Sequence, residues 1–122
     1  MIVAGFGFST RATAQSLEEA LRATGYVGPL DMVACPDDKA LSDVMSDIAR
    51  PRGLMINAVR PGKLEQAQTR TQSVISRLMR RTGSVAEAAA LAAAGPDARL
   101  LHPRAISDDR LATCAIAQGA AT

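Results

Sequence analysis

The sequence predicts an α/β fold: a single compact three-layer domain over residues 1–122, with helices on both faces of a mixed, mainly parallel sheet of about five strands. Short apolar runs of strand length alternate with segments of helical periodicity, as in βαβ units with right-handed crossovers. A length of 122 residues suits one domain. Although 48% of the residues are apolar, only 2% are aromatic, so small aliphatic side chains must build the core.

The first strand and the first helix are marked by an apolar run and a capping sequence. Residues 2–6 form an apolar run of the length of a buried strand. The sequence Ser-Leu-Glu-Glu at 16–19 indicates a capping box that begins a helix, and Gly25 ends this helix. A second apolar run, at 30–35, predicts the second strand.

A second helix and a third strand are expected next. Residues 36–38, Pro-Asp-Asp, open the helix with acidic side chains in the turn where the helix dipole favours them. Apolar residues then recur at helical spacing as far as Pro51, which ends the helix. Residues 53–59 predict the third strand, and Pro61-Gly62 predicts a turn or the start of another helix.

The following part of the chain is polar at first and then rich in alanine. Residues 64–81 predict a short helix or a loop, followed by another helix. Gly83 introduces a second capping box at 84–87, and a helix composed mostly of alanine then extends to Gly95-Pro96. Because alanine combines high helix propensity with small bulk, this helix can pack very close to the sheet.

Two last strands complete the predicted sheet. They lie at 100–101 and 111–117 and are separated by a turn at 107–109. Since no helix joins these two strands, they are expected to run antiparallel.

Residues 50–81 carry a surplus of positive charge. The segment has one acidic residue, Glu65, and these basic residues: Arg50, Arg52, Arg60, Lys63, Arg70, Arg77, Arg80 and Arg81. Such a surplus favours anionic partners. Nucleic acid is not expected as the partner, because the segment lacks the interleaved aromatic residues that bind single strands. A small polycarboxylate, an acidic protein and a solvated face without a partner all remain open.

The sequence gives no sign of a membrane, metal or cofactor. No apolar stretch approaches the ~18 residues of a membrane span. Met1 leads directly into the first apolar run without the basic region of a signal peptide, so a cytoplasmic protein is expected. Cys35 and Cys114 lie in apolar segments and are expected to be buried free thiols. His102, next to Pro103, is expected in a surface loop, and no metal spacing surrounds these three residues.

The opening motif "VAGFGFSTRAT" places two glycines at the end of the first strand. The dinucleotide fingerprint would need a third glycine where Thr10 stands, and the GxxxxGK[ST] phosphate loop is absent. The motif is therefore a tight turn or a loop whose bare amides contact an anion. In the second case Gly5, Gly7, Ser9, Thr10 and Arg11 are candidate substrate-binding residues, since ligands gather beyond the carboxyl ends of parallel strands.

Three further residues are candidates for the same site. Lys39 is expected in the first turn of a helix, where a cation opposes the dipole, so it either serves a site or pairs with Asp43. Ser84 opens the alanine-rich helix, whose N-terminus is able to take a carboxylate or a phosphate. Glu87 is either a site residue or only the last member of its capping box.

Four segments together resemble the CobE family, which is similar to the C-terminal domain of CbiG. They are "VAGFGF", "VACPDDKAL", "RTGSVAEAAALAAAG" and "ATCAIAQG", and they occur in the family's order over nearly the whole chain, 1–122. Family members commonly carry a basic residue directly after GFG, whereas here Ser9 and Thr10 precede Arg11.

The resemblance implies an α/β protein of cobalamin (vitamin B12) biosynthesis that binds or handles a corrinoid or precorrin intermediate, accessory to other pathway enzymes. Corrin precursors carry many carboxylates, which arginines and exposed helix amides would bind. We therefore expect Gly5, Gly7, Lys39, Ser84 and Glu87 to converge at one end of the sheet, with Arg11 nearby.

Two alternatives remain open. The first is a hydrolase that opens the ring lactone of a precorrin-5 type intermediate and releases acetaldehyde, with Lys39 as nucleophile or base and Glu87 as acid or base. CbiG proteins with this activity carry additional domains before the one that this chain resembles. The second alternative is an adaptor that docks an acidic pathway enzyme through Arg77, Arg80 and Arg81.

Overall fold

The protein folds around a five-stranded sheet in the order β3-β2-β1-β5-β4. A computed structural model describes residues 1–40, 42–70 and 84–119, and for 68–70 and 84 only the backbone. The strands are β1 (Ile2–Phe8), β2 (Met32–Pro36), β3 (Met55–Val59), β4 (Arg99–Ile106) and β5 (Ala112–Gln118). Strands β1, β2 and β3 pair in parallel, and β5 pairs antiparallel with both β1 and β4. Only β5 therefore runs against the other four, which confirms the mainly parallel sheet and the antiparallel final pair.

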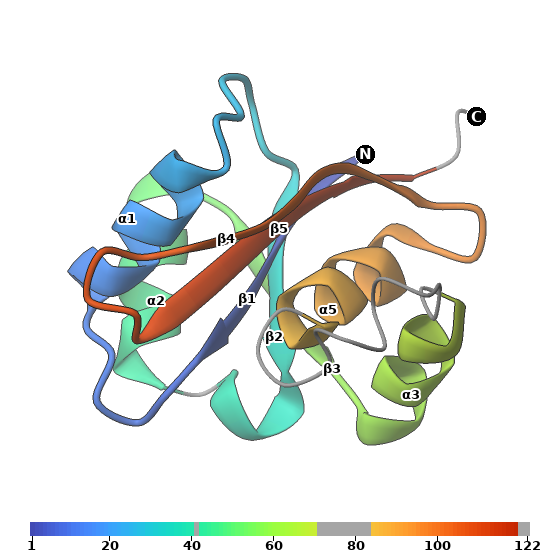
Figure 1. Cartoon of the computed structure of the whole chain (residues 1–122), viewed down its shortest axis with the longest axis horizontal. Coiled ribbons are helices and arrows are strands. Elements are labelled where there is room, and N and C mark those ends of the chain that lie inside the picture. Colours follow the sequence, from blue (N-terminus) through green and yellow to red (C-terminus); the bar gives the residue numbers. More distant parts are fainter. Residues whose placement is uncertain (41, 71–83, 120–122) are drawn as a thin grey trace.

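Helices cover both faces of this sheet, as predicted (Figure 1). On one face, α1 (Ala14–Ala23) and α2 (Asp43–Ala49) pack on the strands; on the other, α5 (Ser84–Ala94) lies against the sheet with α3 (Pro61–Arg70) beside it. The two cores follow the alternation of side chains along the strands. Phe6, Val33 and Ile116 point to the α1–α2 face, whereas Val3, Ala34 and Ala117 point to α5.

Strand β1 is longer than the sequence predicts, and Gly7 lies within it and not in a turn that follows it. Strand β1 continues to Phe8, where Phe8 pairs with Ala112, so Gly5 and Gly7 both belong to the ladder. The long antiparallel partner β5 supplies hydrogen bonds along all of β1, which extends the strand past the predicted end at residue 6. The turn into α1 begins only at Ser9.

The first helix begins two residues before the predicted capping box. Thr13, not Ser16, is the N-cap: its side chain accepts a hydrogen bond from the Ser16 amide, and the Ser16 hydroxyl accepts one from the Thr13 amide. This reciprocal pair is a capping box with serine in place of the usual Glu or Gln. The predicted end is correct, because Gly25 adopts φ 79° directly after the last turn.

The predicted helix between 36 and 51 is broken in two. Asp37–Lys39 forms a single 3₁₀ turn, and α2 starts only at Asp43, capped by the Ser42 side chain. Lys39 therefore does not lie in the first turn of an α-helix, and the expectation that it opposes a helix dipole is wrong. Pro51 lies just after α2, in the 3₁₀ turn Arg50–Arg52, and ends the helix as predicted.

His102 lies in β4 and not in a surface loop. The strand is much longer than the predicted run at 100–101, and register shifts on both sides of His102 accommodate the following Pro103. Proline has no N–H to donate and is tolerated because β4 is an edge strand. The imidazole contacts the Tyr26 ring edge to face, with 5.8 Å between ring centres.

The polar stretch at 64–81 is described only in part. Its beginning belongs to α3, which starts at Pro61 as expected, while residues 71–83 lie outside the described part of the chain. No helix among the described residues has the length and hydropathy that crossing a membrane requires.

Candidate functional site

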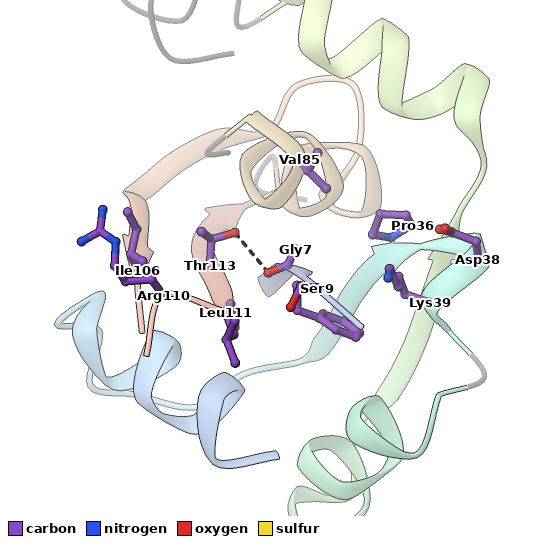
Figure 2. A pocket seen from close by; sticks show the side chains of 12 residues that line it. Gly7, Ser9, Pro36, Asp38, Lys39, Val85, Ile106, Arg110, Leu111 and Thr113 are labelled. Atoms are coloured by element: carbon purple, nitrogen blue, oxygen red, sulfur yellow. Dashed lines mark hydrogen bonds between the residues drawn. The ribbon is translucent and has the colours of Figure 1, made fainter. Parts of the chain in front are cut away.

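A cleft of about 450 Å³ lies where β1 and β2 end, with the β4–β5 turn along one of its sides (Figure 2). Strand order reverses here: β1 leads to β2 through α1 on one face, whereas β3 leads toward β4 through α5 on the other. Such a switch point at carboxyl strand ends is where α/β sheets bind ligands. The walls are mostly apolar, with these side chains: Phe8, Pro36, Val85, Ile106, Leu111 and Ala112.

Small residues form one part of the cleft at the end of β1. Gly7 pairs with Thr113 of β5, and the Thr113 hydroxyl donates a hydrogen bond to the Gly7 carbonyl at 3.3 Å. A Cβ on Gly7 would lie 3.1 Å from Thr113 Oγ1 and 3.3 Å from Val85 Cγ1. Glycine is therefore the residue that leaves space between β1 and the start of α5.

Lys39 supplies a positive charge at one side of the cleft (Figure 2). Its side chain is half-buried, and the ammonium nitrogen lies over the Phe8 ring, 5.4 Å from the ring centre. This cation–π contact holds the amine beside the apolar wall. Within the described residues the amine has no ion-pair partner, so its charge is available to an anionic ligand. Asp38 also lines this side.

The β4–β5 turn forms the opposite side and is fixed by the carboxylate of Asp109. This group accepts hydrogen bonds from the hydroxyls of Ser107 (2.6 Å) and Ser16 (2.5 Å) and from the Leu111 amide (3.0 Å). The Ser107 hydroxyl, then that of Ser16 and the Leu111 amide, hold the pKa of Asp109 below its ordinary value. Since Ser16 belongs to α1, the turn is fastened to a helix.

Some of the predicted site residues meet in this cleft. Gly7, Ser9 and Lys39 line it. Ser84 is the first residue of α5, and the next residue, Val85, lines the cleft, so the start of α5 and Lys39 lie at the same end of the sheet.

Other predicted residues do not line the cleft. Gly5 is buried beneath α5, where a Cβ would lie 2.3 Å from the Ala86 carbonyl oxygen. Thr10 and Arg11 are exposed beyond the end of β1. Gly5 thus serves helix packing, because the backbone of α5 passes directly over it.

Glu87 is half-buried on α5 and points to the edge of the sheet. Its Oε2 accepts a hydrogen bond from the Arg104 backbone N–H at 3.1 Å, at the irregular part of β4. Glu87 is not among the residues that line the cleft. The geometry therefore does not bring Glu87 and Lys39 together as a catalytic pair.

Residues of the β4–β5 turn line the candidate cleft but were not predicted from the sequence. Arg110, Leu111 and Thr113 line the cleft, although the sequence indicated only a turn and a strand here. The turn signal at 107–109 could have drawn attention to Arg110, but its position opposite Lys39 depends on β5 inserting between β1 and β4.

The two cysteines are buried free thiols, as predicted. Burial, and then the nearby charges of Asp38 and Asp37, raise the pKa of Cys35 to about 12, and burial raises the pKa of Cys114 still further. Neither thiol is therefore a nucleophile at neutral pH. The described ranges contain no group of three or more side chains suited to a metal ion.

The basic segment 50–81 is described only up to residue 70, and one of its arginines has a structural role. Arg52 forms a two-point ion pair with Glu18 of α1, which lowers the pKa of Glu18 through hydrogen bonding. Arg77, Arg80 and Arg81, on which the adaptor alternative rests, lie outside the described residues.

A second cavity, of about 430 Å³, lies at the other end of the sheet. It is lined by residues that precede β2 and β3, including Leu30 and Leu54, and by Tyr26 and Arg52. None of the predicted site residues lines it, and the Arg52 guanidinium is engaged by Glu18. The cleft beside Lys39 is therefore the candidate site.

Comparison with known proteins gives concordant matches. The family model described as "Cobalamin synthesis G C-terminus" matches residues 2–117. The chain is similar to the solved structure of cobalamin biosynthesis protein chiG from Agrobacterium tumefaciens strain C58, with 30% identity, a TM-score of 0.75, and 99% of this chain and 100% of that chain covered. It is also similar to CobE, a protein from the cobalamin (vitamin B12) biosynthetic pathway, with 31% identity, a TM-score of 0.75, and 96% and 89% covered. A search of curated proteins finds no match.

Proposed function

The chain belongs to the cobalamin synthesis G C-terminus family, and from this premise we propose that it binds a carboxylated corrin-ring precursor in the cleft beside Lys39. The role is that of an accessory protein that holds a pathway intermediate. The observation that carries the proposal is an apolar-walled cleft at the carboxyl ends of β1 and β2 with a cation at its side.

The chemistry of the cleft suits the edge of a carboxylated macrocycle. A corrin precursor presents flat apolar ring surface and, around its rim, acetate and propionate carboxylates. The apolar walls from β1, β5 and α5 would contact the ring, and Lys39 would bind a rim carboxylate. A volume of about 450 Å³ is within the usual range of ligand pockets and would take up part of the macrocycle, the remainder lying outside.

The geometry favours binding over the lactone hydrolase. A hydrolase of the expected kind would use Lys39 and Glu87 on one substrate, but the Glu87 carboxylate is bonded to the Arg104 amide and lies outside the cleft lining. Binding needs only the walls, Lys39 and the neighbouring backbone.

Equilibrium dialysis against two stable corrinoids tests this proposal. Dicyanocobyrinic acid carries its rim side chains as free carboxylates, whereas dicyanocobinamide carries them as amides on the same ring. We expect the acid to bind more tightly than the amide, and Lys39→Met to weaken binding of the acid about tenfold, the loss of one charge-assisted contact. Visible absorption of the corrinoid on each side of the membrane measures binding.

Lys63→Met is the matched control, because Lys63 is exposed at the start of α3 and does not line the cleft. This variant should bind like the unaltered protein. Equal distribution of dicyanocobyrinic acid across the dialysis membrane at high micromolar protein would contradict the proposal. Equal weakening by both lysine variants would show attraction by overall charge and would also contradict binding at the cleft.

A further inference from the structure

Arg110 has an unusual backbone conformation at the mouth of the cleft. Its φ is 63°, in the left-handed region, and among the residues that the structure describes it is the one non-glycine with a positive φ. A side chain with a Cβ is disfavoured here, and glycine or asparagine is the usual occupant. Such outliers persist where surrounding contacts hold them, and they concentrate at functional sites.

Hydrogen bonds of Arg110 and of its two neighbours in the chain, Asp109 and Leu111, hold this conformation. The Arg110 amide donates to the Ser107 carbonyl at 2.9 Å, and the Asp109 carboxylate is bound by three donors. On the other side, the Leu111 carbonyl accepts a hydrogen bond from the Ser9 amide at 2.9 Å. The turn is thus fastened to α1 and to the end of β1, and Arg110 is fixed at the cleft mouth.

The Arg110 side chain lies across the cleft from Lys39 (Figure 2). It is exposed, and within the described part of the chain its guanidinium has no ion-pair partner. The Asp109 carboxylate next to it is occupied by its own hydrogen bonds, and Asp38 lines the side where Lys39 lies. Lys39 and Arg110 therefore lie on opposite sides of the apolar walls, with the Lys39 amine directed into the cleft and the Arg110 guanidinium directed outward from its rim (Figure 2).

We propose that Arg110 is a second ligand-binding residue, whose guanidinium binds a carboxylate on the edge of the ligand opposite to the edge held by Lys39. The inference rests on the proposed function and narrows it: the ligand is a polycarboxylate with free acids on two opposite edges. At φ 63° a glycine or an asparagine would make the turn more stable than an arginine does. The presence of arginine at position 110 is then explained by what its side chain binds.

Two substitutions of Arg110 distinguish the effect of its side chain on binding from the effect of its backbone conformation on stability. Arg110→Asn removes the guanidinium and suits the left-handed conformation, so it should weaken binding of dicyanocobyrinic acid about tenfold while raising the midpoint of thermal unfolding. Arg110→Lys keeps the charge and the strain, so it should retain most of the binding and leave the midpoint unchanged. Arg22→Asn, on the exposed end of α1, is the charge-matched control and should bind normally.

The outcomes distinguish this inference from the proposed function. If the unaltered protein binds the acid and Lys39→Met weakens binding, but Arg110→Asn binds normally, the inference is wrong and the proposed function stands. If the unaltered protein does not bind the acid, both are wrong. If Arg110→Asn weakens binding but also lowers the unfolding midpoint, while Arg110→Lys does not restore binding, the residue acts in folding and the inference is overturned.

Discussion

Gly5 and Gly7 stand two residues apart on one face of β1, and both face α5. A Cβ on Gly5 would meet the helix backbone at Ala86 and Ala90, whereas a Cβ on Gly7 would meet side chains of Val85 and Thr113. The first glycine lets the helix approach the sheet closely, and the second leaves room at the start of the cleft. One short motif thus contains a glycine that serves helix packing and a glycine that lines the cleft.

Substitution Gly5→Ala should destabilise the protein strongly. The added methyl group would lie 2.3 Å from the Ala86 carbonyl oxygen and 2.5 Å from the Ala90 nitrogen, and backbone atoms cannot rotate away as side chains do. We expect a loss of about 3 kcal/mol in the free energy of unfolding, the upper part of the range for overpacked cores, measured by urea denaturation.

Gly62→Ala is the matched control for this substitution. Gly62 lies in the first turn of α3, and a methyl group added there would have nothing within 4 Å, so the change should be neutral or should stabilise the protein by up to about 1 kcal/mol. Unchanged stability in Gly5→Ala would mean that α5 does not lie against β1 as described.

At the scale of elements, the turn between β4 and β5 is held by a helix that is distant in sequence. The buried Ser16 hydroxyl of α1 both closes the capping box with Thr13 and donates to Asp109 in the turn. One hydroxyl therefore joins the start of α1 to the side of the cleft. The Glu87 carboxylate likewise joins α5 to this hairpin, because it accepts a hydrogen bond from the Arg104 amide at the irregular part of β4.

Asp109→Asn should lower the stability of the protein in a pH-dependent way. The hydrogen bonds hold the folded-state pKa of Asp109 below its ordinary value of 3.8, so the carboxylate contributes stability above about pH 4, and this contribution is lost as the pH falls through the folded-state pKa. The variant should unfold at a lower temperature than the unaltered protein at pH 7, and the difference should shrink below pH 4.

Asp108→Asn provides the control for this experiment, because Asp108 is the exposed neighbour and the substitution changes the net charge equally. Its unfolding temperature should follow that of the unaltered protein from pH 3 to pH 7. A pH-independent difference for Asp109→Asn would show that the carboxylate charge does not hold the turn.

At the scale of the whole molecule, the central strands are buried from both sides by separate cores. The α1–α2 face contains larger side chains such as Phe6, Met45 and Ile116, whereas the α5 face is filled mainly by alanine. Cys35 and Cys114 lie in central strands within the first core, and both are fully buried. Access to either thiol therefore requires the sheet to separate from its helices.

Alkylation by iodoacetamide should report this separation. At pH 8 both thiols should react at least about a thousandfold more slowly than an exposed thiol, because they react only in the opened molecule, and denaturant should remove the difference. Val27→Cys supplies the exposed thiol, since Val27 is 92% exposed. Mass spectrometry counts the labels. Rapid labelling of Cys35 in the native protein would mean that the α1–α2 face opens independently.

The residue pattern alone determined the class of fold and most of its elements. Apolar runs at strand length, the alanine-rich segment ending at Gly95 and the turn at 107–109 were sufficient to predict a mainly parallel sheet with an antiparallel final pair. These features are local, because side-chain periodicity, glycine and proline act over a few residues. Three of the residues that line the candidate cleft, Gly7, Ser9 and Lys39, were named from the sequence for the same reason, because they follow or end apolar runs.

The tertiary structure decided what local patterns do not contain. Insertion of β5 beside β1 extended that strand to Phe8 and placed Arg110 across the cleft from Lys39. Gly5 lies under α5, where the helix packs closely on the sheet. The Glu87 carboxylate accepts a hydrogen bond from the Arg104 amide of β4 and therefore does not line the cleft. Each of these outcomes depends on contacts between segments that are distant in the chain, and such contacts follow from the strand order of the sheet.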